Sequence, residues 1–183
     1  RGWIHPILIG DPDAIKAEAE AANLTFHPDQ VLPAWSETEA AQRAASLLRS
    51  GSTHAAMKGL IHTDILLKAL LNASAGLRQP GTRVSHVFLA EFQPAELLAV
   101  TGGAGNIAPA LTAKGAILQH AIDLMASIGV DLPKAAMLSA VETVNPLISS
   151  SLDAAALSVM AHRGQVHGAL VDGPLAFDNA ISL

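Results

Sequence analysis

The strongest constraint on the fold is a repeated pattern in which a short apolar run is followed by a capped helix. Residues 3–9 have the apolar, β-favouring character of a strand, and Gly10-Asp11-Pro12 then supplies a turn, an N-cap and a first-turn proline. These signals predict a helix from Asp13 to Ala22. Ser36 and Glu39 form a capping box for the next helix.

The same pattern extends along most of the 183-residue chain. Further strands are expected at residues 53–59, 135–138 and 165–171, and further helices at residues 62–73, 112–128 and 152–161. Strands that alternate with helices of this length predict an α/β fold, a largely parallel sheet with flanking helices.

One section departs from this alternation. Val84–Phe92 and Leu97–Val100 are strand-like runs joined by only a few residues around Pro94. Two strands with so short a connection run antiparallel. The sequence therefore predicts an antiparallel hairpin within the α/β fold.

Composition and charge exclude several function classes. Half of the residues are apolar and 15% are charged, which is typical of a chain that buries a core. The net charge of -5, without a cluster of Lys and Arg, argues against nucleic acid as a partner. The absence of cysteine excludes disulfides, thiolate metal sites and cysteine nucleophiles, and favours a reducing cytoplasm. No apolar stretch approaches the roughly 18 to 20 residues of a membrane span, so we expect no membrane partner.

Ligands of open α/β sheets bind beyond the carboxyl ends of the strands, where this chain has several polar segments. In "KGLIHTD", Lys58, His62 and Thr63 precede a helix whose N-terminal amides would favour a phosphate group. The alternative is that Thr63 only caps the helix and that His62 is a surface residue. The segment therefore leaves a phosphate site and a simple cap both open.

A glycine loop at Gly103–Ala108 has the pattern G-x-G-x-x-A. A dinucleotide site requires the helix to begin on the glycines and an acidic residue to end a second strand. Here Pro109 interrupts the helix, and Asp123 lies inside a helical run. The loop, which includes Asn106, is thus either a turn that needs glycine or an anion-binding surface of backbone amides.

Two further segments carry candidate binding residues. Ser139 and Asn145 follow an expected buried strand directly, although Asn-Pro is also an ordinary turn signal. Asp172 and Asp178 flank a Gly-Pro turn, where they could bind a metal, act as an acid-base pair or hold the turn by bonds to the backbone, of which the last is commonest. The eight histidines have no metal-ligand spacing, and no nucleophile-elbow or Walker motif is present, so we expect no metal site.

Five segments, in this order and spacing, resemble the phosphate acetyl/butyryltransferase family, whose members are phosphotransacetylase-like enzymes. They are "AAMKGLIHTD", "VSHVFLAEF", "NIAPAL", "AMLSAVETVNP" and "SLDAAALSVMAHRGQVHGALVDGPLAFDNAIS". The resemblance implies reversible transfer of an acyl group, in which acyl-CoA and phosphate give acyl phosphate and CoA, without a metal or bound cofactor. It also implies a homodimer of subunits with two α/β domains, similar to isocitrate and isopropylmalate dehydrogenases, and an active site in the cleft between the domains.

The resemblance places substrate-binding residues in this cleft, where they would hydrogen-bond phosphate or the acyl carbonyl: His62, Thr63, Ser139, Asn145 and Asp172, with Lys58, Asn106 and Asp178 as second choices. It further implies that the general base and a neighbouring Ser-Arg pair lie beyond Leu183. Residues 1–183 are therefore expected to be the central portion of a two-domain enzyme, without its first strand-helix unit and its C-terminal part.

Acetyl is the expected acyl group, but the sequence leaves three alternatives open. One is a phosphate butyryltransferase with a longer acyl group, because a single methylene changes discrimination by only about 1 to 3 kcal/mol. Another is a noncatalytic fragment that binds CoA or phosphate. The third, a nicotinamide-dependent dehydrogenase on the related fold, is disfavoured by the context of the glycine loop.

We predict that residues 1–183 alone form little or no acyl phosphate, because the resemblance places the base outside them. An assay of acetyl phosphate formation from acetyl-CoA and phosphate checks this expectation. Measurable product from this chain by itself would contradict it.

Overall fold

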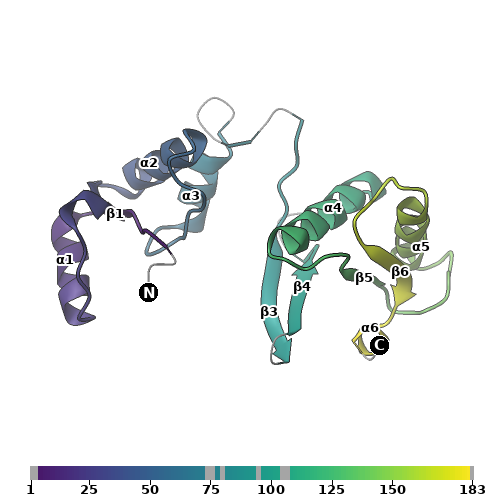
Figure 1. Cartoon of the computed structure of the whole chain (residues 1–183). Coiled ribbons are helices and arrows are strands. Elements are labelled where there is room, and N and C mark those ends of the chain that lie inside the picture. Colours follow the sequence, from purple (N-terminus) through teal and green to yellow (C-terminus); the bar gives the residue numbers. More distant parts are fainter. Residues whose placement is uncertain (1–3, 73–76, 79–80, 94–95, 104–107, 182–183) are drawn as a thin grey trace. The chain divides into compact units, whose positions relative to one another are not determined.

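The computed structural model describes residues 4–72, 77–78, 81–93, 96–103 and 108–181. The chain divides into two compact units, Arg1–Thr82 and Arg83–Leu183. Each unit has its own helices and its own paired strands (Figure 1). Within the described residues, no helix is long and apolar enough to cross a lipid bilayer.

The first unit contains two short parallel strands and three α-helices. They are β1 (Leu8–Gly10), α1 (Pro12–Ala21), the 3-10 turn η1 (Pro28–Gln30), β2 (Val31–Pro33), α2 (Glu37–Arg49) and α3 (Thr63–Leu70). Strand β1 pairs with β2, and the connection between them contains α1. Helix α2 packs on α3 and on β1 through small residues, and Ala34, Ala41 and Ala45 are buried.

The N-caps at Asp11 and Ser36 are confirmed. The carboxylate of Asp11 accepts a hydrogen bond from the backbone N–H of Asp13 at 2.9 Å, and Pro12 begins α1. The hydroxyl of Ser36 accepts from the N–H of Glu39 at 3.2 Å, but the carboxylate of Glu39 accepts from the N–H of Trp35 at 2.9 Å instead of that of Ser36, so the reciprocal half of the capping box is wrong. Local hydrogen bonds of this kind depend only on neighbouring residues, so they are readable from sequence.

The strand expected at residues 53–59 is wrong. This segment forms no strand, and residues 54–60 are exposed, with Met57 98% accessible to solvent. The apolar run Ala55-Ala56-Met57 is short and is broken by Lys58-Gly59, and no described strand pairs with it. The true partner of β1 is β2, whose three residues lie among prolines and gave no strand signal.

The second unit begins with the expected antiparallel hairpin. Strand β3 (Val87–Gln93) pairs with β4 (Glu96–Thr101), and α4 (Leu111–Ser127) then contacts β4. The remaining elements are β5 (Lys134–Leu138), α5 (Ser149–His162), β6 (Leu170–Leu175) and α6 (Phe177–Ala180). Strands β5 and β6 are parallel, and α5 packs on both of them.

The core of this unit lies between α4, α5 and the segment that connects α5 to β6. Its buried centre consists of Leu118, Ile122, Leu157 and Val166, each less than one-tenth exposed. Gly115 lets α4 approach α5 closely, since a Cβ at this position would lie 3.0 Å from the terminal methyl of Met160. Burial of these side chains supplies the main stabilising free energy of the unit.

The α/β class is confirmed, but the single largely parallel sheet is not. The described strands form three separate two-stranded sheets, of which two are parallel and one is antiparallel. Strands β1 and β2 belong to the first unit, and the hairpin strands pair only with each other. Alternation of strands and helices predicted the parallel pairs, but it carries no information about which pairs join edge to edge.

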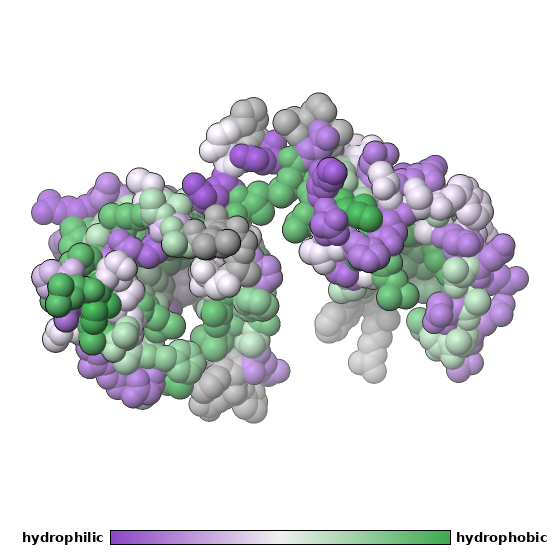
Figure 2. Space-filling view, turned by 180° about the vertical axis from the view of Figure 1, so that it is seen from behind, coloured by the Kyte–Doolittle hydropathy of each residue, from purple (hydrophilic) through white to green (hydrophobic). Residues whose placement is uncertain are grey.

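Apolar side chains remain exposed on both units, as the green areas of Figure 2 show. Met57 and Leu67 in the first unit and Phe88, Val144 and Leu147 in the second are examples. Large apolar patches on a protein surface are typical of protein contact surfaces. The homodimer expected from the resemblance stays a prediction.

Strand β6 begins and ends later than predicted. The expected strand covered residues 165–171, but the pairing runs from Leu170 to Leu175 and passes through Gly173 and Pro174, which are joined by a cis peptide bond. Ala136 pairs with Asp172, and Leu138 pairs with Leu175. Gly173 and Pro174 of β6 therefore both lie opposite one residue of β5, Met137. The expected Gly-Pro turn is thus a β-bulge inside the strand.

Gly173 is required where β6 passes β5. A Cβ on this residue would lie 2.6 Å from Cβ of Met137 and 2.7 Å from its carbonyl oxygen, and φ of Gly173 is 155°. Both the contact and the backbone conformation exclude a side chain.

We predict that Gly173→Ala destabilises the second unit by about 3 kcal/mol or more, because overpacking adds to the backbone cost. Gly164→Ala is the matched control, since φ there is 74° and no atom lies within 4 Å of an added Cβ. It should cost only about 1 to 2 kcal/mol. Thermal unfolding followed by circular dichroism measures both, and equal losses would contradict the packing argument.

Candidate functional site

The predicted site residues fall into two groups, one in each unit. Lys58, His62 and Thr63 lie in the first unit at the start of α3. The second unit contains Ser139, Asn145, Asp172 and Asp178, which lie after or within β5 and β6 and at α6. Asn106 lies outside the described residues.

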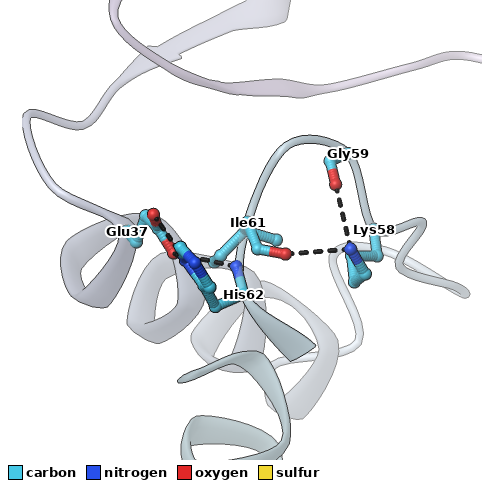
Figure 3. A network of polar contacts seen from close by, with 5 residues as sticks. All are labelled: Glu37, Lys58, Gly59, Ile61 and His62. Atoms are coloured by element: carbon cyan, nitrogen blue, oxygen red, sulfur yellow. Dashed lines mark hydrogen bonds and ion pairs between the residues drawn. The ribbon is translucent and has the colours of Figure 1, made fainter. Parts of the chain in front are cut away.

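A hydrogen-bonded charge pair fixes the start of α3 (Figure 3). The backbone N–H of His62 donates to the carboxylate of Glu37 at 2.8 Å, and Nδ1 of His62 lies 2.8 Å and 3.0 Å from the two carboxylate oxygens. Glu37 is the first residue of α2, so its carboxylate joins the N-termini of two helices. The N-cap of α3 is therefore His62, and the expected capping by Thr63 is wrong.

Lys58 is bonded within its own loop. Its ammonium nitrogen Nζ donates to the carbonyl oxygens of Ile61 at 2.9 Å and Gly59 at 3.3 Å. An ammonium group has three N–H donors, so one remains for a ligand or for water. The segment therefore offers a cation and an imidazole beside a helix N-terminus, in a loop whose shape two charged side chains hold.

The pair shifts the acid-base behaviour of both partners. The side-chain hydrogen bond to Glu37, together with the charge of that carboxylate, raises the pKa of the His62 imidazole above its usual range. The hydrogen bonds from the backbone and the side chain of His62 lower the pKa of the Glu37 carboxyl. The His62 side chain is nonetheless 76% exposed, so solvent weakens the interaction.

In the second unit, Ser139 lies where the parallel strands β5 and β6 end. Its backbone N–H donates to the carbonyl oxygen of Leu175 at 2.9 Å, and its hydroxyl lies 2.9 Å from the hydroxyl of Ser150 in the first turn of α5. Ser139 is thus held by the end of β6 and by the start of the next helix.

Asn145 lies on the same loop, six residues further along. Its backbone N–H donates to the hydroxyl of Ser151 at 2.9 Å, and its side-chain oxygen Oδ1 accepts from the N–H of Leu147 at 2.9 Å. The amide nitrogen Nδ2 makes no hydrogen bond within the described part of the chain. Two N–H donors of Asn145 are therefore available to a ligand oxygen.

Asp172 and Asp178 do not form an acid-base pair in the structure. One carboxylate oxygen of Asp172 accepts from the N–H of Gly173 at 2.8 Å, so this residue holds the backbone of β6 at the bulge. Asp178 is exposed in the first turn of α6. Among the described residues, no group of three histidine, aspartate or glutamate side chains could hold a metal ion.

The loop residues of the second unit can bind a ligand but offer no evident covalent chemistry. Hydroxyl and amide groups donate hydrogen bonds to oxygen atoms of a phosphate or a carbonyl. This set of donors at the carboxyl ends of parallel strands is what the sequence predicted for a ligand site.

Comparison with known proteins decides the family. A family model described as "Phosphate acetyl/butaryl transferase" matches residues 34–183. The chain belongs to the phosphate acetyl/butyryltransferase family. Residues before 34 have relatives in this family as well, since the similarity to the phosphate acetyltransferase of Rickettsia felis covers 98% of this chain, with 47% identity over 184 residues.

Relatives with two acyl specificities are similar to the chain. Besides the Rickettsia felis protein, the probable phosphate butyryltransferase of Bacillus subtilis is 40% identical over 171 residues, which is 93% of this chain and 57% of that protein. The chain covers 52% of the Rickettsia felis phosphate acetyltransferase. It therefore spans about half the length of the curated relatives that it matches.

Two solved structures share the fold. A branched-chain phosphotransacylase from Enterococcus faecalis V583 superposes with a TM-score of 0.73 at 27% identity, covering 96% of this chain and 71% of that chain. The EutD phosphotransacetylase from Staphylococcus aureus has a TM-score of 0.72 at 17% identity, covering 100% of this chain and 64% of that chain. The second likeness concerns the fold alone.

Three residues that hold the candidate binding residues in place were not found from sequence. Glu37 lies 25 positions before His62, and nothing in the pattern pairs them. Ser150 and Ser151 belong to a run of three serines at the start of α5. That run was a usable signal, because consecutive hydroxyls at a helix N-terminus commonly bond to the preceding loop.

We predict that the Glu37–His62 pair stabilises the first unit only within a pH window. The ordinary pKa values are 4.5 and 6.5. Because the folded pKa of His62 is raised, its contribution is complete below about 6.5 and is lost as pH rises through the folded value. Because the folded pKa of Glu37 is lowered, its contribution is present above about 4.5 and is lost as pH falls through the folded value.

Titration of the His62 imidazole by NMR in wild type and Glu37→Gln checks this. The variant should lower the pKa of His62 and flatten the pH dependence of unfolding between the two limits. Glu18→Gln, an exposed carboxylate change in α1, is the control and should leave His62 unchanged. An unchanged pKa of His62 in Glu37→Gln would show that the pair does not form in solution.

Proposed function

We propose that the chain forms part of an enzyme that transfers an acetyl group between CoA and inorganic phosphate. The observation that carries this proposal is the match of the family model across residues 34–183. The identity of 47% to a protein named phosphate acetyltransferase supports acetyl as the acyl group.

The chemistry required agrees with the donors of the described loops. In one direction the CoA thiolate attacks the carbonyl carbon of acetyl phosphate, the C–O bond to phosphate breaks, and inorganic phosphate leaves with the electron pair. Negative charge develops on the carbonyl oxygen and on the leaving phosphate, and hydrogen-bond donors stabilise both. Ser139 and Asn145 are proposed to donate to these oxygens, with Asp172 and Asp178 shaping the loop around them.

The first unit is proposed to help bind the anionic substrates. Lys58 has a free N–H donor, and the raised pKa of His62 favours its protonated form near neutral pH. With Thr63 at the start of α3, these groups would bind a phosphate group. Asn106 in the glycine loop stays a candidate for the same role.

Several finer features are part of the proposal. A two-domain arrangement similar to isocitrate and isopropylmalate dehydrogenases, a cleft between the domains and a homodimer follow from the family resemblance. A cytoplasmic location follows from the absence of cysteine. The general base and a Ser-Arg pair are proposed to come from a segment that follows Leu183. No metal or bound cofactor is needed in this scheme, because the thiolate of CoA is itself the nucleophile.

A phosphate butyryltransferase is the second candidate. The 40% identity to a probable phosphate butyryltransferase favours it, and the length of the acyl pocket decides between the two. Acyl phosphate formation from acetyl-CoA and from butyryl-CoA, measured with the longest gene product that contains residues 1–183, separates them. CoA binding without turnover by that product would instead favour the noncatalytic binding protein.

We predict that Ser139→Ala and Asn145→Ala each lower kcat of this product by about tenfold or more, because each removes a donor to developing charge. Ser127→Ala is the control, since its hydroxyl bonds only to the Leu124 carbonyl at the end of α4. Activity within twofold of wild type in both loop variants would contradict their role.

A further inference from the structure

Ser151 is a polar side chain that the fold buries completely. Its solvent exposure is 0%, and among the described residues no other polar residue is buried. Burial of a hydroxyl is unfavourable unless hydrogen bonds replace those to water. The bonds that Ser151 makes therefore indicate what its burial achieves.

The hydrogen bonds of the Ser151 hydroxyl all go to the turn that precedes α5. Its oxygen Oγ accepts from the backbone N–H of Asn145 at 2.9 Å, and it lies 2.9 Å from the carbonyl oxygen of Asn145 and 2.8 Å from that of Ile148. A hydroxyl has one hydrogen, so it donates to one of these carbonyls while its lone pairs accept the N–H. Ser151 thus holds the backbone N–H of Asn145, whose carbonyl oxygen also accepts from the N–H of Ile148 at 3.0 Å.

The neighbouring serine fixes the other end of the same loop. Ser150 lies 2.9 Å from Ser139, hydroxyl to hydroxyl, and Ser139 is the first residue after β5. The first turn of α5 thus contacts both ends of the loop, at residues 139 and 145. Ser149 completes the run, but it is exposed and its hydroxyl makes no hydrogen bond among the described residues.

We propose that Ser150 and Ser151 are positioning residues of the acyltransferase site, which fix Ser139 and Asn145 for contact with substrate. This inference rests on the proposed function. The two serines touch no substrate themselves. They act through the loop, because the two ligand-facing groups keep their places only while the first turn of α5 holds the backbone.

A purely structural role predicts a different result. If Ser151 only closed the start of α5, its loss would lower stability and leave ligand affinity unchanged at temperatures where the protein is folded. A matched case is Ser158, whose half-buried hydroxyl bonds to the carbonyls of Ala154 and Gly173 in the same unit but does not touch the loop. Ser158→Ala therefore measures the loss of stability without the loss of positioning.

Titration calorimetry of acetyl phosphate, which carries both the acyl carbonyl and the leaving phosphate, against the 183-residue chain tests the proposal. We expect Ser151→Ala to bind acetyl phosphate about tenfold more weakly than wild type, while Ser149→Ala and Ser158→Ala stay within twofold. Ser151→Thr retains the hydroxyl and should recover most of the affinity. Hydrogen exchange of the Asn145 amide, monitored by NMR, should be slow in wild type and Ser149→Ala and fast in Ser151→Ala.

The possible outcomes distinguish this inference from the proposed function. Wild-type affinity for acetyl phosphate in Ser151→Ala would overturn the positioning role and leave the proposed function intact. No binding of acetyl phosphate by the wild-type chain would overturn the binding role of the loop, and the positioning role with it. If Ser151→Ala fails to fold, Ser150→Ala replaces it, because that half-buried hydroxyl is less costly to remove. Unchanged affinity in Ser150→Ala would then overturn the proposal.

Discussion

The close approach of Gly173 to Met137 is the constraint on which the second unit depends. At this point β6 passes β5 with no room for a side chain, and Ser158 of α5 bonds to the carbonyl of the same glycine. Two strands and the helix that covers them therefore meet at one residue. The bulge also sets the register by which the N–H of Ser139 reaches the carbonyl of Leu175, where the loop with the candidate binding residues begins. The position of the candidate site follows from this backbone contact.

The two units hold their candidate binding residues by different physical means. In the first unit, an exposed hydrogen-bonded pair ties His62 to Glu37, and because both side chains titrate, the arrangement depends on pH. In the second unit, neutral hydroxyls at the start of α5 hold the loop, and the most important of them is removed from solvent. That arrangement is insensitive to pH near neutrality. The proposed acyltransferase would thus have a titratable group, His62, for the charged parts of its anionic substrates. It would have neutral hydrogen-bond donors, held in fixed positions, for the acyl group that reacts.

Features that depend on neighbouring residues could be predicted from the sequence. The helix starts at Asp11 and Ser36 and the hairpin were readable because caps and short connections are local signals. The strand expected at residues 53–59 was wrong, and β2 was missed, because strand pairing is decided by distant partners. Ser139 and Asn145 could be placed at the end of a strand, but the partners that fix them could not. Burial of Ser151 and the pairing of Glu37 with His62 arise only when separate segments pack together.

The central claim is that the loop from Ser139 to Ser151 binds the substrates of acyl transfer. Mapping of backbone amide shifts by NMR during addition of CoA and acetyl phosphate tests it most directly, because every described amide reports separately. The account predicts saturable shifts concentrated at residues 139–151 and at the start of α3, with α1 unchanged. Saturable shifts confined to other parts of the chain, or no shifts at millimolar ligand, would contradict it.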